Sequence, residues 1–88
     1  MDTEQQENFQ KELLMALKPS YPWAIPIRSI RSLVPHHFRF PEDKPFLEEL
    51  SDLEERDLVA QGEKVIGKAN TIWKITAKGR DFLAGAKL

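Results

Sequence analysis

Prolines divide the first half of this chain into short segments. All six prolines lie between residues 19 and 45. Proline ends or kinks a helix when it lies in the interior, but it is well tolerated in the first turn. We therefore expect helices that stop before Pro19 and Pro35, and helices that start near Pro26 and Pro45.

The apolar residues between these prolines recur with helical spacing. Apolar side chains at i, i+3, i+4 and i+7 are typical of one buried helix face. The spacing predicts helices over about residues 4–18, 26–34 and 43–57. Their expected buried faces are Phe9, Leu13, Ala16 and Leu17 in the first, Ile27, Ile30, Leu33 and Val34 in the second, and Leu47, Leu50, Leu53 and Leu58 in the third.

Residues suited to helix ends flank these segments. Thr3 followed by Gln6 has the form of a capping box, in which each side chain bonds the other residue's backbone. Asp43 is a good N-cap for the third helix, and Thr76 is one for a last helix near the C-terminus. Asp57 is expected to end the third helix in a left-handed conformation, which Asp tolerates.

The pattern changes from helical to alternating in the last third of the chain. Residues 64–66 and 71–75 are predicted strands, and the Gly- and Asn-containing connection over 67–70 suits a hairpin. The run 21–25 has too many flanking prolines for a long strand, but it can form a short edge strand. Alternation places Trp73 and Ile75 on one face of the last strand, and Ile72 and Lys74 on the other.

The chain's size and composition favour one small domain over residues 1–88. Hydrophobic residues make up 41% of the 88. A domain this small needs nearly all of them to form one core. There is no cysteine, so disulfides, thiol catalysis and cysteine-bound metal are excluded. The polar first residues show no secretory signal, and no run approaches the roughly 20 apolar residues that span a bilayer. We expect a cytoplasmic protein that does not associate with membranes.

Two segments resemble the winged helix-turn-helix family, in the style of PadR-like and MarR-like regulators. Residues 47–59 are similar to the family's recognition helix and its L-x-x-L-x-x-x-G-L-I exit, with Asp57 where the family usually has Gly. Residues 73–83 are similar to the family's Y-x-L-T-x-x-G-x-x-x-L run from the third strand into the last helix. The stretch 35–42 is longer than the tight turn of a typical helix-turn-helix. The resemblance implies an α+β winged helix, with a three-helix core, a C-terminal β-hairpin wing and a short last helix.

The resemblance also implies binding to duplex DNA, in the manner of a small transcriptional regulator. The third helix would enter the major groove by its N-terminal end, and the wing would touch the phosphate backbone. Phosphates are contacted by Lys, Arg and other donors, and bases by side chains such as Arg, Lys and Asn. Each such side chain can equally be an ordinary solvated residue. The candidates are Arg28, Arg31, His37, Arg39, Lys44, Lys64, Lys68, Asn70 and Lys74, with His36 beside them.

The charge distribution favours an alternative. Residues 42–57 carry eight acids and two bases, a net charge of −6, whereas residues 58–88 carry six bases and two acids, a net charge of +4. The expected solvent face of the third helix is Glu48, Asp52 and Glu55, and these carboxylates would repel phosphates. A protein-interaction module is therefore the second hypothesis. In it the acidic face binds a basic partner surface or the basic wing of a second copy.

Other chemistry has little support in the sequence. His36 and His37 are the only histidines, and with no cysteine they make a weak metal site. No serine lies in a Gly-flanked elbow and no Gly-rich phosphate loop is present, so we expect neither an enzyme nor a cofactor. Trp73 is expected in the core. Four aromatic residues near the helix connections are interpreted as lids over the core or as exposed anchors for a partner: Tyr21, Trp23, Phe38 and Phe40.

Overall fold

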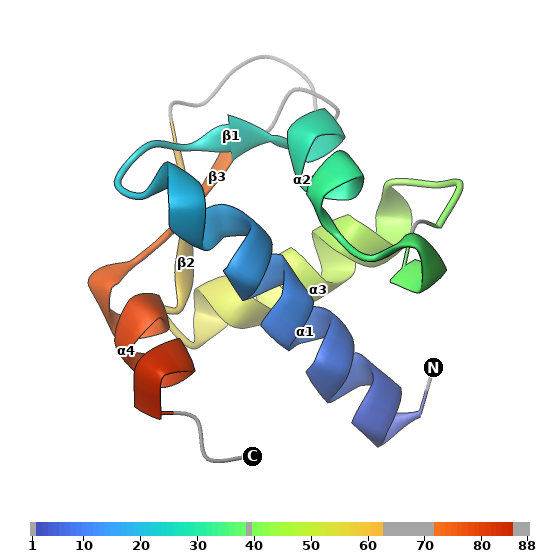
Figure 1. Ribbon diagram of the computed structural model, residues 1–88, viewed down its shortest axis with the longest axis horizontal. Helices are drawn as coiled ribbons and strands as arrows, with labels where there is room; N and C mark the ends of the chain where they lie inside the picture. The colour runs from blue at the N-terminus through green and yellow to red at the C-terminus, as the bar shows by residue number, and fades with distance from the viewer. Residues whose placement is uncertain (1, 39, 63–71, 86–88) are drawn as a thin grey trace.

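The computed structural model describes residues 2–38, 40–62 and 72–85. These residues form an α+β arrangement in which helices pack around one another and against a small antiparallel sheet (Figure 1). The coarse fold class is therefore confirmed. The elements are α1 (Thr3–Leu17), the 3-10 turn η1 (Lys18–Ser20), β1 (Ile25–Pro26), α2 (Ile27–Leu33), the 3-10 turn η2 (His36–Phe38), α3 (Lys44–Glu55), β2 (Val59–Gln61), β3 (Ile72–Ile75) and α4 (Ala77–Gly85).

The sheet has the order β1–β3–β2, with both neighbours antiparallel to β3. Trp73 in β3 lies opposite Ile25 of β1 on one side and Gln61 of β2 on the other. The short strand expected around residues 21–25 is present, displaced to Ile25–Pro26. Val59 starts β2, although the sequence pattern placed it at the helix exit. The predicted strand over 64–66 lies outside the described residues.

The helix ends differ from the predictions in small, local ways. Asp2, not Thr3, caps α1: its carboxylate accepts from the Gln5 N–H at 2.8 Å, and the Gln5 side chain accepts from the Asp2 N–H at 3.4 Å. Pro26 is the N-cap of α2 and part of β1, so it precedes the helix that it was expected to begin. Asp43 occupies the N-cap position of α3, but its side chain makes no capping hydrogen bond.

The core lies between α1, α2, α3 and the inner face of the sheet. Phe9 of α1 is fully buried in it, and the ring centres of Phe38 and Phe46 each lie 5.2 Å from that of Phe9. Trp73 and Ile75 are buried, as the alternation predicted. One expected core position, Leu33, was wrong, and another, Leu47, packs against the core only at its edge. Leu33, at the end of the short helix α2, is 55% exposed, and Leu47 is only partly buried because α3 buries Phe46 in its place.

The turn between α3 and β2 is tied to the start of α4. Asp57 has φ 63°, which confirms the expected left-handed conformation. The Thr76 hydroxyl donates to the Asp57 carbonyl at 2.7 Å and accepts from the Gly79 N–H at 3.0 Å, so Thr76 caps α4 as predicted. Gly79 is packed against the Leu58 carbonyl with no room for a Cβ. Among the described residues, no helix is long and apolar enough to cross a membrane.

Candidate docking groove

An open groove runs between the exposed side of α3 and the sheet. Ionisable residues of α3 supply one wall, and Trp73 and Gln61 contribute from β3 and β2. Of the described residues, those that line it are Lys44, Leu47, Glu48, Ser51, Asp52, Glu55, Gln61 and Trp73. One base against three acids gives these lining residues a formal charge of −2.

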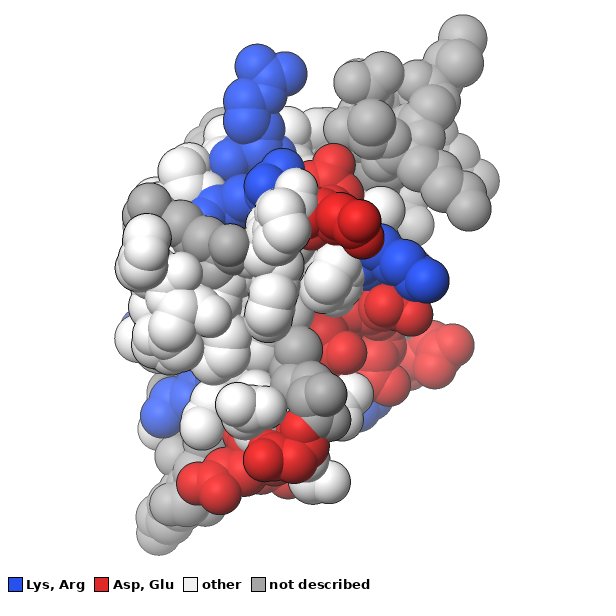
Figure 2. Space-filling model, turned by 90° about the vertical axis from the view of Figure 1, so that its right-hand side faces the viewer, with Lys and Arg blue, Asp and Glu red and all other residues white. Residues whose placement is uncertain are grey.

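The three acids lie on α3 at i, i+4 and i+7, which brings them to one side of the helix. Glu48, Asp52 and Glu55 are all exposed, as the sequence predicted for this face. Carboxylates so close together add their potentials within a Debye length of about 8 Å at physiological salt. On the face drawn in Figure 2, acidic side chains gather in groups, and basic ones lie at the top, at the right-hand edge and at the lower left. The groove is therefore suited to cations and unfavourable to phosphates.

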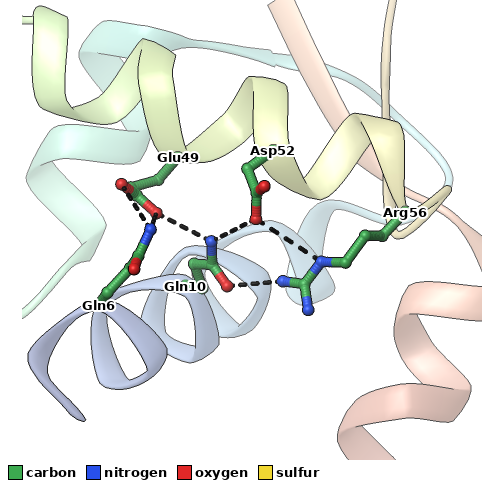
Figure 3. Close-up of polar contacts among 5 residues, drawn as sticks. All are labelled: Gln6, Gln10, Glu49, Asp52 and Arg56. Carbon is green, nitrogen blue, oxygen red and sulfur yellow. Dashed lines mark hydrogen bonds and ion pairs between the residues drawn. The ribbon is translucent and has the colours of Figure 1, made fainter. Parts of the chain in front are cut away.

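A polar network between α1 and α3 holds part of this acidic surface in place (Figure 3). The Gln10 amide donates to Glu49 Oε1 and to Asp52 Oδ2, both at 2.8 Å. Gln6 donates to Glu49 at 3.0 Å, and Arg56 donates to the Gln10 amide oxygen at 2.6 Å. Gln10 is 8% exposed, so its polar atoms are satisfied by these partners and not by bulk water. Asp52 thus has a structural role in addition to its place in the groove.

Arg31, one of the candidate DNA-contacting residues, makes structural contacts within the fold. Its guanidinium pairs with the Asp43 carboxylate at 2.9 Å and donates to the carbonyls of Phe40 and Pro41 at 3.1 and 3.2 Å. It also lies 5.9 Å from the centre of the Phe46 ring. These contacts hold the segment after η2 against α2 and engage three of the five guanidinium N–H donors.

The other predicted DNA-contacting residues are dispersed. Arg28 is exposed on α2, and His37 is exposed with its ring 4.3 Å from that of Phe38. Lys44 begins α3 and lines the groove. Lys74 lies opposite Ala60, and by alternation it faces away from the side of the sheet that carries Trp73. Arg39, Lys64, Lys68 and Asn70 lie outside the described residues.

The four aromatic residues near the connections divide between the two interpretations. Phe38 is buried and Phe40 packs against the core, so both are lids. Trp23 is 73% exposed and remains a candidate anchor. Tyr21 is at the surface, with the Arg80 guanidinium 4.4 Å from its ring centre. Over the described ranges, no three His, Cys, Asp or Glu side chains gather as metal ligands would.

Sequence reasoning missed two features of this site. Trp73 was expected only as a core residue, yet it lines the groove, and its buried indole Nε1 has no hydrogen-bond partner in the described part of the chain. The network around Gln10 was also missed. Gln6 and Gln10 share a helix face with Leu13, at i, i+4 and i+7, and polar residues on an apolar face signal a buried polar contact.

Comparison with known proteins finds no match: no family model, no curated protein and no solved structure matches this chain. The function therefore has to be argued from the geometry of the groove and its charges.

Proposed function

We propose that this chain is a winged-helix interaction module that binds a basic segment of a partner protein in the groove between α3 and the sheet. The order of the elements supports the winged-helix assignment: a helix, a short strand, two helices, two strands paired as β2–β3, and a last helix. In that fold α3 and the hairpin form the recognition surface, and the groove lies between α3 and these strands.

The observation that carries the proposal is the charge of the groove. Glu48, Asp52 and Glu55 face it with only Lys44 as a counter-charge among the described lining residues. Two unit charges 4 Å apart in water interact with about 1 kcal/mol, so several like contacts together outweigh one favourable contact. A phosphate backbone laid along α3 meets net repulsion. For a Lys- or Arg-rich segment, the electrostatic interactions with the same carboxylates are attractive.

Duplex DNA is the second candidate, in keeping with a small cytoplasmic transcriptional regulator. Two observations favour it: Lys44 lies in the first turn of α3, and Arg28 is exposed on α2. Both fit a mode in which only the N-terminal end of α3 and the wing approach the phosphates. In this binding mode the acidic middle of α3 has to lie away from the major groove of the DNA.

Fluorescence anisotropy with two labelled probes separates the candidates. One probe is a short Lys-rich peptide and the other a mixed-sequence duplex DNA, each titrated over a series of salt concentrations. We expect the peptide to bind, and the double variant Glu48→Lys/Glu55→Lys to lose that binding. The matched control for each single change, Glu48→Lys or Glu55→Lys, is Asp81→Lys, which reverses one exposed charge on α4 and should leave peptide binding unchanged.

The opposite pattern would reject the peptide hypothesis. DNA binding by the native chain that weakens steeply with salt, and that is lost in Arg28→Ala/Lys44→Ala, would assign the surface to phosphate recognition. Binding of neither probe at low salt would refute both candidates.

A further inference from the structure

Trp73 lines the acidic groove, and its indole N–H is buried without an acceptor among the described residues. The residue is 2% exposed, and its Nε1 has no hydrogen-bond partner within the described ranges. Its neighbours across the sheet are Ile25, whose side chain has no polar atom, and Gln61, which also lines the groove. A buried polar group left unpaired costs about 1–3 kcal/mol, and such groups in native structures call for an explanation.

We propose that the groove receives the basic partner segment in an extended conformation, and that a main-chain carbonyl of the segment accepts the Trp73 indole N–H. This inference rests on the proposed function and specifies the form of its ligand. The acidic side chains of α3 bind the Lys and Arg side chains of the segment, and the Trp73 indole N–H binds its main chain.

The chemistry of the two groups selects an extended segment over a helix. Lys and Arg side chains contain donors only, so they cannot accept from the indole. A helix uses all its carbonyls internally except the last four. An extended segment leaves its carbonyls available, because its backbone makes no internal hydrogen bonds. Of the candidate basic ligands, an extended one therefore offers both charges and acceptors along its whole length.

The spacing of Glu48 and Asp52 agrees with an extended ligand. Glu48 and Asp52 are four residues apart on α3, a rise of about 6 Å along the helix axis. Alternate residues of a strand point the same way and are about 6.6–6.8 Å apart. Basic residues at every second position would therefore match the Glu48–Asp52 spacing, and Glu55 lies a further three residues, about 4.5 Å, along the axis.

Binding in this form requires a small movement of the groove wall. Because Trp73 Nε1 is buried, the carbonyl reaches it only when a neighbouring side chain shifts. Gln61 is the exposed residue opposite Trp73 in the β2–β3 register, and its side chain can move into solvent. The environment of the indole should consequently change on binding.

The test follows the indole N–H of Trp73 by ¹H–¹⁵N NMR in the full chain. The chain has two tryptophans, and Trp23→Phe removes the exposed one and identifies the remaining signal. The probes are a short peptide with Lys alternating with Ser and an Ala-rich helical peptide with the same number of Lys. We expect the alternating peptide to shift the Trp73 signal downfield and slow its exchange with water. It should bind about 5–10-fold more tightly than the helical peptide, the equivalent of one net hydrogen bond.

Trp73→Phe keeps an aromatic ring and removes the donor, so it should abolish the preference for the alternating peptide. If this variant does not fold, the NMR shift in the native chain decides the question. Peptide binding that leaves the indole signal unmoved would overturn the extended-segment inference and leave the proposed function standing. The inference would also fail if the helical peptide moved the signal equally. Absence of any peptide binding would remove the proposed function as well.

Discussion

Replacing Gln10 by Ala tests whether the network between α1 and α3 stabilises the fold. Gln10 is 8% exposed and makes three hydrogen bonds. It donates to Glu49 and Asp52 and accepts from Arg56. All three partners are charged groups, and such hydrogen bonds contribute about 1.5–3 kcal/mol each when their surroundings are dry.

The surroundings here are only partly dry, which lowers the expected loss. The side chains of Asp52 and Arg56 are 49% and 46% exposed, so water can replace the hydrogen bonds that they lose when Gln10 is removed. A loss of about 0.5–1 kcal/mol per hydrogen bond, with some buried stem, gives about 2–3 kcal/mol for Gln10→Ala. In a domain of this size that lowers the melting temperature by about 10–20 °C.

Urea unfolding followed by circular dichroism measures this change. The matched control is Gln6→Ala on the same helix, because Gln6 contacts only Glu49 in this network and should cost about 1 kcal/mol or less. Gln10→Glu, which puts a third carboxylate between Glu49 and Asp52, should be more destabilising than Gln10→Ala. A cost for Gln10→Ala below about 0.5 kcal/mol, the range of an ordinary surface change, would refute the network as drawn.

Three further expectations can be checked by the same unfolding measurement. Glu48→Lys should change stability by less than about 0.5 kcal/mol, whereas Asp52→Lys should cost about 1–2 kcal/mol because it breaks contacts with α1; equal effects would contradict this. Gly79→Ala should destabilise by about 2 kcal/mol or more, since its Cβ overlaps a backbone carbonyl, while Gly85→Ala meets open space and serves as the control. Asp57→Val should cost about 1–2 kcal/mol at its positive φ, and Asp57→Gly should be near neutral; a tolerated Val would exclude that backbone conformation.

Local signals were enough to predict most of the elements. The prolines and apolar spacing located three helices, and the Asp57 and Thr76 predictions were confirmed because each depends on one residue's own conformational preference. The cap of α1 was ambiguous: Asp2 and Thr3 are both good N-caps, and each has a glutamine three residues later. Sequence alone has no means to choose between these two registers, and the structure uses the first.

The candidate site was less predictable, because its contacts join distant parts of the chain. The exposed acidic face followed from the helical period of α3. The roles of Arg31 and Asp52 did not, since their partners lie 9–12 and 42 residues away in sequence. Periodicity gives the side of a helix on which a residue lies, but not which other element covers that side.

The internal pairs also determine which charges are left to act on a ligand. Arg31 is engaged with Asp43, and Asp52 is engaged with Gln10 and Arg56, so neither side chain offers its whole charge to a partner. Glu48 and Glu55 remain as the exposed acids of the groove for which no such contact is found in the described part of the chain. Glu48 and Glu55 should therefore contribute the larger share of the attraction for a basic segment, and Asp52 the part of its charge that its internal contacts leave exposed. Reversing Glu48 and Glu55 should affect binding and not folding, whereas reversing Asp52 should affect folding first.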